Sequence, residues 1–184
     1  MRIRVEGLVL SQRHSRAVLL SSVRMPKQAK DNPGVIAPPP LILATALALG
    51  AVLDRVYPAR IFGPGAGDVS RYVAAGVLIA AGLALMATFL SAFRQHGTNV
   101  PTYKPATALV TDGPYRFTRN PGYVSMFLVF AGIVLAADSV WLAILLVAFA
   151  IVIHFGVVAR EERYLEGKFG EDYRRYKQKV RRWV

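Results

Sequence analysis

The sequence predicts an all-α fold: a multi-spanning membrane helix bundle of about four transmembrane helices, with a cytoplasmic loop and a C-terminal amphipathic helix. Three observations predict it. The chain of 184 residues is 54% hydrophobic and only 18% charged, whereas water-soluble domains average about 25% charged residues. Its uncharged stretches are long enough to cross a bilayer as helices, and its 23 Lys and Arg residues flank them.

The first two predicted spans differ in length. Residues 41–53 follow three prolines and are short, so this span reaches across the bilayer only if Val56 and Tyr57 extend it or Arg55 snorkels to the interface. Residues 73–92 are 20 uncharged residues, enough to cross a hydrocarbon layer of roughly 30 Å as a helix.

The third and fourth spans are predicted to form a hairpin. Residues 120–159 contain one charge, Asp138, near their middle. We expect helices over residues 121–137 and 140–159, with Asp138 or Ser139 capping the second helix. Asn120 followed by Pro121 is typical of a helix start, with Asn as the N-cap and Pro in the first turn.

The positive residues predict the orientation in the membrane. Residues 1–40 contain seven Lys and Arg, residues 54–72 three, residues 93–119 four, the Asp138 turn none, and the tail from Arg160 nine. Because Lys and Arg accumulate in cytoplasmic loops, both termini are expected in the cytoplasm, and a bacterial inner membrane is the expected location. The basic residues flank apolar spans, so the bilayer is the expected partner and nucleic acid is not.

The chain divides into a basic N-terminal arm, residues 1–38, and a membrane domain, residues 39–184. The arm lacks the long apolar region and cleavage site of a signal peptide. A start of translation at Met25 is an alternative that would remove residues 1–24. Cysteine is absent, which excludes disulfides and zinc–thiolate sites, and no metal site is expected. The sequence leaves the oligomeric state open.

The connector between the second and third spans, residues 93–123, is the first candidate for chemistry. It is far longer than the usual helix connection of roughly 2 to 8 residues, and its prolines and aromatic residues favour an ordered segment. Arg116 and Arg119 lie just before the start of the third span, where unpaired amide groups and the helix dipole favour an anion. The alternative is a pair of arginines that contact lipid headgroups.

Two acidic residues, Glu161 and Glu162, follow the last predicted span in a tail dominated by cations. Carboxylates at a helix C-terminus oppose the helix dipole, so they need positive partners. These partners are either neighbours on the same helix or the arginines of the connector. Further along the tail, four aromatic residues alternate with basic ones and are expected to face the lipid headgroups; they are Phe169, Tyr173, Tyr176 and Trp183.

These motifs resemble a known family. The strings GPYRFTRNPGY before an apolar hairpin, and REERYL and FGEDYRRY after it, resemble the integral-membrane methyltransferases grouped around isoprenylcysteine carboxyl methyltransferase and the related phospholipid N-methyltransferases. The resemblance covers residues 97–183. It implies methyl transfer from S-adenosylmethionine to a lipophilic acceptor that enters from the membrane.

The resemblance also implies site residues. Arg119 and Glu162 would be catalytic, and the cofactor-binding set would be Gly113, Tyr115, Arg119, Asn120, Pro121, Tyr123, Glu161 and Glu162. Asn120 stands where the carboxyl methyltransferases usually have His, which weakens the prenylcysteine assignment. In this scheme Arg119 holds the carboxylate of the cofactor, while a glutamate binds its ammonium group or orients Arg119. Tyr115 and Tyr123 would flank the sulfonium.

Several alternatives stay open. The acceptor is an isoprenylcysteine-type carboxylate or a phospholipid amine, and an amine would need Glu162 or His96 to accept a proton. A membrane sterol or isoprenoid reductase that binds NADPH is a second class of function, and a non-enzymatic membrane adaptor is a third. His154, inside the last span, is either a functional group or a hydrogen-bonded structural residue.

Overall fold

A computed structural model describes residues 31–63, 68–97 and 104–184. Residues Asn32–Val184 form one compact unit. Most of the expected basic arm, residues 1–38, lies outside the described residues, and so does part of the connector. The division into an arm and a membrane domain therefore stays a prediction.

The described chain is helical, which confirms the predicted fold class. Its α-helices are α2 (Pro39–Val56), α3 (Asp68–Gln95), α4 (Pro121–Ala137), α5 (Val140–Ile151), α6 (Ala159–Phe169) and α7 (Glu171–Lys179). A short 3-10 turn, η1 (Gly113–Arg116), and a π-helical segment, η2 (Val152–Val158), complete the described elements. Three segments are long and apolar enough to cross a membrane: Pro39–Val56, Val69–Gln95 and Val140–Phe169. The third predicted span, which corresponds to α4, is apolar but only 17 residues long.

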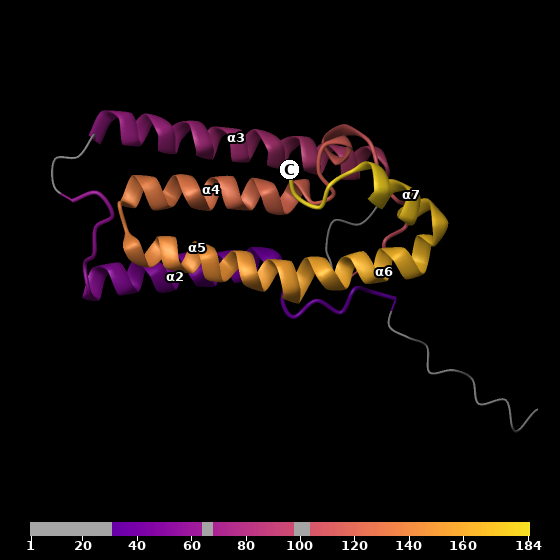
Figure 1. Ribbon diagram of the computed structural model, residues 1–184, viewed down its shortest axis with the longest axis horizontal. Helices are drawn as coiled ribbons and strands as arrows, with labels where there is room; N and C mark the ends of the chain where they lie inside the picture. Colours follow the sequence, from indigo (N-terminus) through magenta and orange to yellow (C-terminus); the bar gives the residue numbers. More distant parts are fainter. Residues whose placement is uncertain (1–30, 64–67, 98–103) are drawn as a thin grey trace, which may run out of the picture. The chain divides into compact units, whose positions relative to one another are not determined.

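The helices are arranged in two packed pairs. Helix α3 lies along α4, and α2 lies along α5, with the hairpin turn joining the pairs at one end (Figure 1). Buried Phe130, Phe149 and Ile153 form the centre of the core between them. Many large apolar side chains point outward instead: Val77 is 62% exposed and Val147 61%. An apolar outer surface is what a lipid-facing helix requires, because lipid tails offer no hydrogen bonds.

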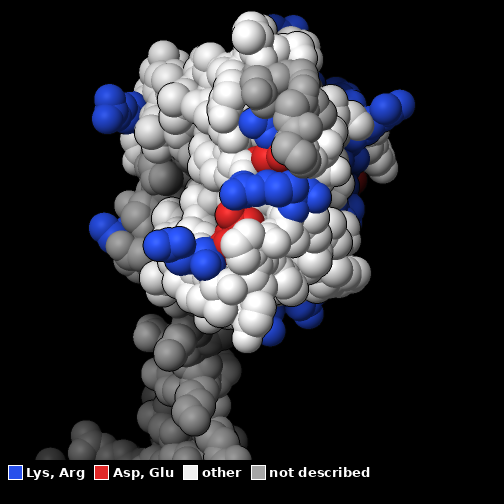
Figure 2. Space-filling model, turned by 90° about the vertical axis from the view of Figure 1, so that its left-hand side faces the viewer, with Lys and Arg blue, Asp and Glu red and all other residues white. Residues whose placement is uncertain are grey.

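The α4–α5 turn is built around Asp138. This residue ends α4 in the left-handed conformation, with φ of 54°. Its carboxylate accepts hydrogen bonds from the backbone N–H groups of Ile61 and Phe62 and lies 2.9 Å from the guanidinium of Arg71. Ser139 caps α5 by accepting a hydrogen bond from the N–H of Leu142. Of the two predicted capping residues, Asp138 and Ser139, it is therefore Ser139 that caps the helix. Figure 2 looks onto this end and shows acidic and basic side chains side by side within a mostly uncharged face.

One prediction about the ends of helices is wrong. The last helix does not stop at residue 159: it continues through the π-helical segment into α6 and ends at Phe169. Glu161 and Glu162 therefore lie inside a helix, where they meet other residues and not an opposing dipole. Asn120 occupies the N-cap position of α4 and Pro121 begins the helix, as predicted. The side chain of Asn120 makes no capping bond, because it donates to the carbonyl of Arg182 instead.

The aromatic residues of the tail are also placed differently from the prediction. Helix α7 is amphipathic, but Tyr173 and Tyr176 are buried, at 1% and 8% exposure. Trp183 packs against Phe127 and His154. Tyr173, Tyr176 and Trp183 thus face the protein, whereas the basic residues of α7 face outward.

Candidate functional site

A cavity of about 410 Å³ lies at the end of the bundle opposite the Asp138 turn. Its walls come from the start of α2 and the segment before it, the end of α3, the connector, the start of α4, and helices α6 and α7. Apolar and aromatic side chains form most of the lining, among them Phe89, Phe93, Met126 and Leu165. Charged side chains reach it from two elements: Lys104 and Arg119 from the connector, and Glu161 and Glu162 from α6. The volume falls within the range of roughly 300–1,000 Å³ that small-molecule sites occupy.

Arg119 and Glu162 meet directly. A guanidinium nitrogen of Arg119 lies 3.0 Å from a carboxylate oxygen of Glu162, and the two side chains are only 8% and 7% exposed. Arg119 also donates to the backbone carbonyl of Lys177 in α7. Its Nε is buried and has no hydrogen-bond partner among the described residues. The connector and the last long helix therefore meet at the mouth of the cavity, where the Nε–H group of Arg119 is available to a ligand.

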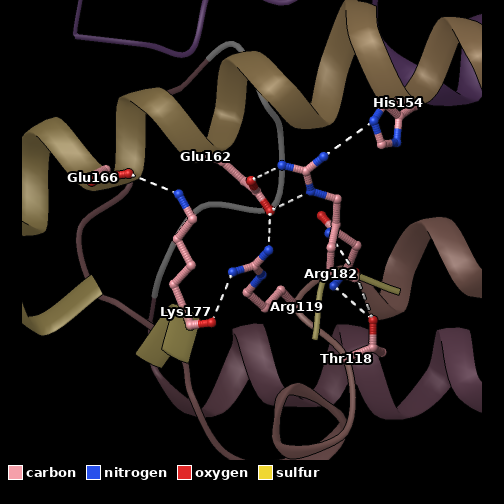
Figure 3. A network of polar contacts seen from close by, with 8 residues as sticks. Thr118, Arg119, His154, Glu162, Glu166, Lys177 and Arg182 are labelled. Atoms are coloured by element: carbon pink, nitrogen blue, oxygen red, sulfur yellow. Dashed lines mark hydrogen bonds and ion pairs between the residues drawn. The ribbon is translucent and has the colours of Figure 1, made fainter. Parts of the chain in front are cut away.

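A third charged residue, Arg182, completes this network and was missed by the sequence analysis. Its Nε and Nη2 donate to the two carboxylate oxygens of Glu162, at 3.1 and 2.6 Å (Figure 3). The hydrogen bonds to Glu162 raise the pKa of the Arg182 guanidinium. Its Nη1 lies 3.2 Å from Nε2 of His154. No sequence spacing relates these residues, so no local signal identifies Arg182.

Glu161 and two tyrosines form the other side of the cavity. The hydroxyl of Tyr123 donates to Glu161 at 2.8 Å. Tyr115 packs against Phe89 and Phe93, with ring centroids 6.3 and 6.0 Å away. Burial, with a smaller contribution from Glu161, raises the pKa of the Tyr115 hydroxyl well above its ordinary value. Tyr115 is thus a neutral aromatic wall next to a carboxylate.

The remaining predicted residues lie around the cavity in different ways. Asn120 lines it, whereas Gly113 and Pro121 do not. Gly113 begins the 3-10 turn with a positive φ of 54°, a conformation that favours glycine. Pro121 is the buried first residue of α4. Both shape the backbone that carries Tyr115 and Arg119.

Two other sequence candidates lie apart from the cavity lining. Arg116 is exposed and lines a separate surface depression. His96 pairs with Asp112 at 3.3 Å and contacts the carbonyl of Ala92. Within the described residues no group of three or more metal-binding side chains occurs.

Comparison with known proteins places this geometry in a family. Residues 70–172 match the model of the phospholipid methyltransferase family, and the match includes the connector, α4, α5 and α6. The chain belongs to the phospholipid methyltransferase family. This confirms the resemblance seen in the sequence motifs, and membership in this family together with the apolar helices makes the chain an integral-membrane methyltransferase.

A relative and a search of solved structures complete the comparison. An uncharacterized protein of Haemophilus influenzae is 47% identical over 64 residues, which are 34% of this chain and 98% of that protein. No solved structure matches the chain. Neither the family match nor the Haemophilus influenzae protein identifies the substrate or the cofactor.

Proposed function

We propose that the protein transfers a methyl group from S-adenosylmethionine to a lipophilic acceptor at the cytoplasmic face of the membrane. The observation that carries the proposal is the meeting of Arg119 with Glu162 at the mouth of a mostly apolar, aromatic cavity. A charged rim suits the polar part of a cofactor. An apolar interior suits an acceptor that arrives from the bilayer.

The residues present fit the chemical groups of S-adenosylmethionine, which carries a carboxylate, an ammonium, a sulfonium and an adenine. Arg119 has a buried Nε without a partner in the described chain, and arginine binds carboxylates well because its donors match their geometry. The N–H groups of Tyr123 and Val124 already donate to the carbonyl of Asn120. Arg119 therefore has to supply most of the binding of the carboxylate.

The two glutamates take different roles in this proposal. Both oxygens of Glu162 accept bonds from arginines, so Glu162 orients Arg119. Glu161 accepts one bond, at Oε1 from Tyr123, and its second oxygen is the better acceptor for an ammonium group. The faces of Tyr115 and Tyr123 would attract a sulfonium by cation–π interaction, worth roughly 0.5–2 kcal/mol.

The cofactor supplies a methyl group on a positively charged sulfur, which needs no metal to be transferred. The protein has to align the acceptor and exclude water, and such alignment is worth on the order of 7–11 kcal/mol. A carboxylate acceptor needs no base. For an amine acceptor, Glu162 is held by two arginines and His96 by Asp112, so neither of the bases expected from the sequence is free in the cavity. An amine acceptor would have to lose its proton to Glu161, which this proposal assigns to the ammonium group of the cofactor. A carboxylate acceptor of the isoprenylcysteine type is therefore favoured over a phospholipid amine.

Binding calorimetry on the detergent-purified protein tests the proposal. We expect saturable binding of S-adenosylhomocysteine and none of NADPH. Binding of NADPH alone would support a membrane reductase, and binding of neither would support a non-enzymatic adaptor.

Two variants with a matched control test the site. Arg119→Ala and Glu162→Gln should each weaken binding of S-adenosylhomocysteine about a hundredfold or more, because each breaks a buried charge pair. Arg116→Ala removes an exposed arginine of the same connector and should bind like the wild type. Equal affinity in all three variants contradicts the assignment.

The acceptor is identified by comparing the lipids and lipid-modified molecules of cells with and without the protein. A product heavier than its precursor by one methylene group is expected only in cells that contain it. A carboxyl methyl ester supports the proposed acceptor class, and an N-methylated headgroup supports the alternative.

A further inference from the structure

We propose that Arg182 is a positioning residue of this site: it holds Glu162 in the orientation in which Glu162 presents Arg119 to the cavity. The inference rests on the proposed function, since it concerns the arginine expected to bind the cofactor. Arg182 lies beyond residues 70–172, which match the family model. Its role is therefore argued from its own contacts.

The first step is the geometry at Glu162. Arg182 approaches this carboxylate as a fork, with Nη2 2.6 Å from one oxygen and Nε 3.1 Å from the other. Arg119 shares the second of these oxygens, at 3.0 Å. A bidentate pair fixes the plane of a carboxylate, which a single bond does not. The plane set by Arg182 thus decides where the remaining lone pairs point, and Arg119 bonds to one of them.

The second step is how the guanidinium of Arg182 is itself held. Its Nη1 donates to Nε2 of His154 at 3.2 Å. The neighbouring Trp183 packs against the ring of His154, with centroids 5.9 Å apart, and against Phe127. His154 lies in the π-helical segment, a rare geometry that is frequent at functional sites. The fork is therefore anchored to the last long helix as well as to Glu162.

The third step is that the backbone around Arg182 is fixed without its side chain. Thr118 Oγ1 donates to the carbonyl of Arg182 at 3.1 Å (Figure 3), and Asn120 Nδ2 donates to the same carbonyl at 2.9 Å. The N–H of Arg119 donates to the carbonyl of Arg181 at 2.9 Å. Removing the guanidinium leaves these bonds in place. The substitution removes the bidentate contact with Glu162 but keeps the backbone at residue 182 in position.

The test compares Arg182→Ala and Arg182→Lys with the control Arg181→Ala. Arg181 is the exposed neighbour, and its side chain makes no ion pair with the part of the chain that the structure describes, so the control removes the same charge without the fork. Two quantities are measured at a temperature where each variant is folded. One is the affinity for S-adenosylhomocysteine; the other is the rate at which phenylglyoxal modifies Arg119, read by mass spectrometry of the peptide.

In Arg182→Ala we expect affinity to fall about tenfold to hundredfold, as misplacement of a binding group by about 1 Å does, and Arg119 to be modified several-fold faster. Arg182→Lys should lie between, because an ammonium cannot form the fork. Arg181→Ala should match the wild type. If Arg182→Ala matches the control in both measurements, the proposal is overturned.

Two further outcomes are decided by the same design. Should Arg182→Ala fail to fold, Arg182→Lys carries the test, and wild-type values in both measurements overturn the proposal. The wild type itself could fail to bind S-adenosylhomocysteine while phenylglyoxal modifies Arg119 faster in Arg182→Ala than in the wild type and in Arg181→Ala. In that case the positioning role of Arg182 stands and the proposed function fails.

Discussion

At the scale of single residues, the bond between Tyr123 and Glu161 is the simplest to test. Tyr123→Phe removes the hydroxyl that donates to Glu161 at 2.8 Å and keeps the ring. We expect the free energy of unfolding to fall by about 1–2 kcal/mol, because a hydrogen bond to a carboxylate at a shielded position is lost. Thermal unfolding in detergent measures it. Tyr57→Phe, at a position 63% exposed, is the control and should unfold like the wild type; equal loss in both contradicts the role of the bond.

The sequence predicted all the charged residues of this polar network except Arg182. Arg119 and the two glutamates were identifiable because each stands in a short motif next to an apolar span. Arg182 was not, since it lies in a run of basic residues where nothing distinguishes it from Arg181. Only the tertiary fold shows which of the two faces a buried carboxylate.

At the scale of elements, glycines set how closely α3 and α4 pack. A Cβ atom built on Gly82 would lie 2.8 Å from the carbonyl oxygen of Ser125, and one on Gly132 would lie 2.8 Å from that of Ala75. These obstacles are backbone atoms, which cannot turn away. Small residues at such contacts let membrane helices approach each other.

Gly82→Ala and Gly132→Ala should therefore each destabilise the protein by about 1–3 kcal/mol, the usual cost of overpacking. Gly76→Ala, on the same helix α3, adds a methyl group to open space and should be neutral or slightly stabilising, because alanine favours the helix. Unfolding midpoints of the three variants measure the difference. The explanation fails if all three midpoints coincide.

The hairpin turn offers a second test at this scale. Asp138→Ala removes the acceptor for the N–H groups of Ile61 and Phe62 and leaves the partly buried Arg71 without this carboxylate. We expect a loss of about 3–5 kcal/mol, as for other broken buried pairs. Asp138→Asn should lose less, because asparagine tolerates the left-handed conformation and keeps an acceptor. Chemical unfolding of both variants checks the order, and an alanine variant as stable as the wild type would refute it.

Helix positions were predicted better than helix ends. The hairpin helix over residues 121–137 was found with the observed bounds, because proline and the Asp138 turn mark its limits in the sequence. The end of the last long helix was placed too early, because charge at residues 160–163 suggested that the helix leaves the membrane and stops. Charged residues end a hydrophobic span without ending a helix, and the ion pairs with Arg119 and Arg182 stabilise Glu162 inside it.

At the scale of the whole molecule, the predicted fold class is confirmed. It depends on the length and hydrophobicity of the apolar segments, which can be read from the sequence without knowledge of tertiary contacts. The cavity could not be predicted in the same way. Tyr173 and Tyr176 line it, although their alternation with basic residues is equally typical of an interfacial helix. Their direction is decided by the turn at Gly170, whose positive φ of 54° folds α7 back from α6.

The orientation of the molecule is the last prediction, and the absence of cysteine makes it testable. Each single introduced cysteine is a unique label, because the chain has none of its own. Phe62→Cys reports on the end with the Asp138 turn, while Thr111→Cys and Lys179→Cys report on the end with the cavity; all three positions are exposed.

The cavity side carries most of the Lys and Arg residues, so it should face the cytoplasm. A membrane-impermeant thiol reagent should label only Phe62→Cys in intact cells and all three after the membrane is opened. Labelling of Thr111→Cys or Lys179→Cys in intact cells would place the site outside, where no cytoplasmic cofactor reaches it.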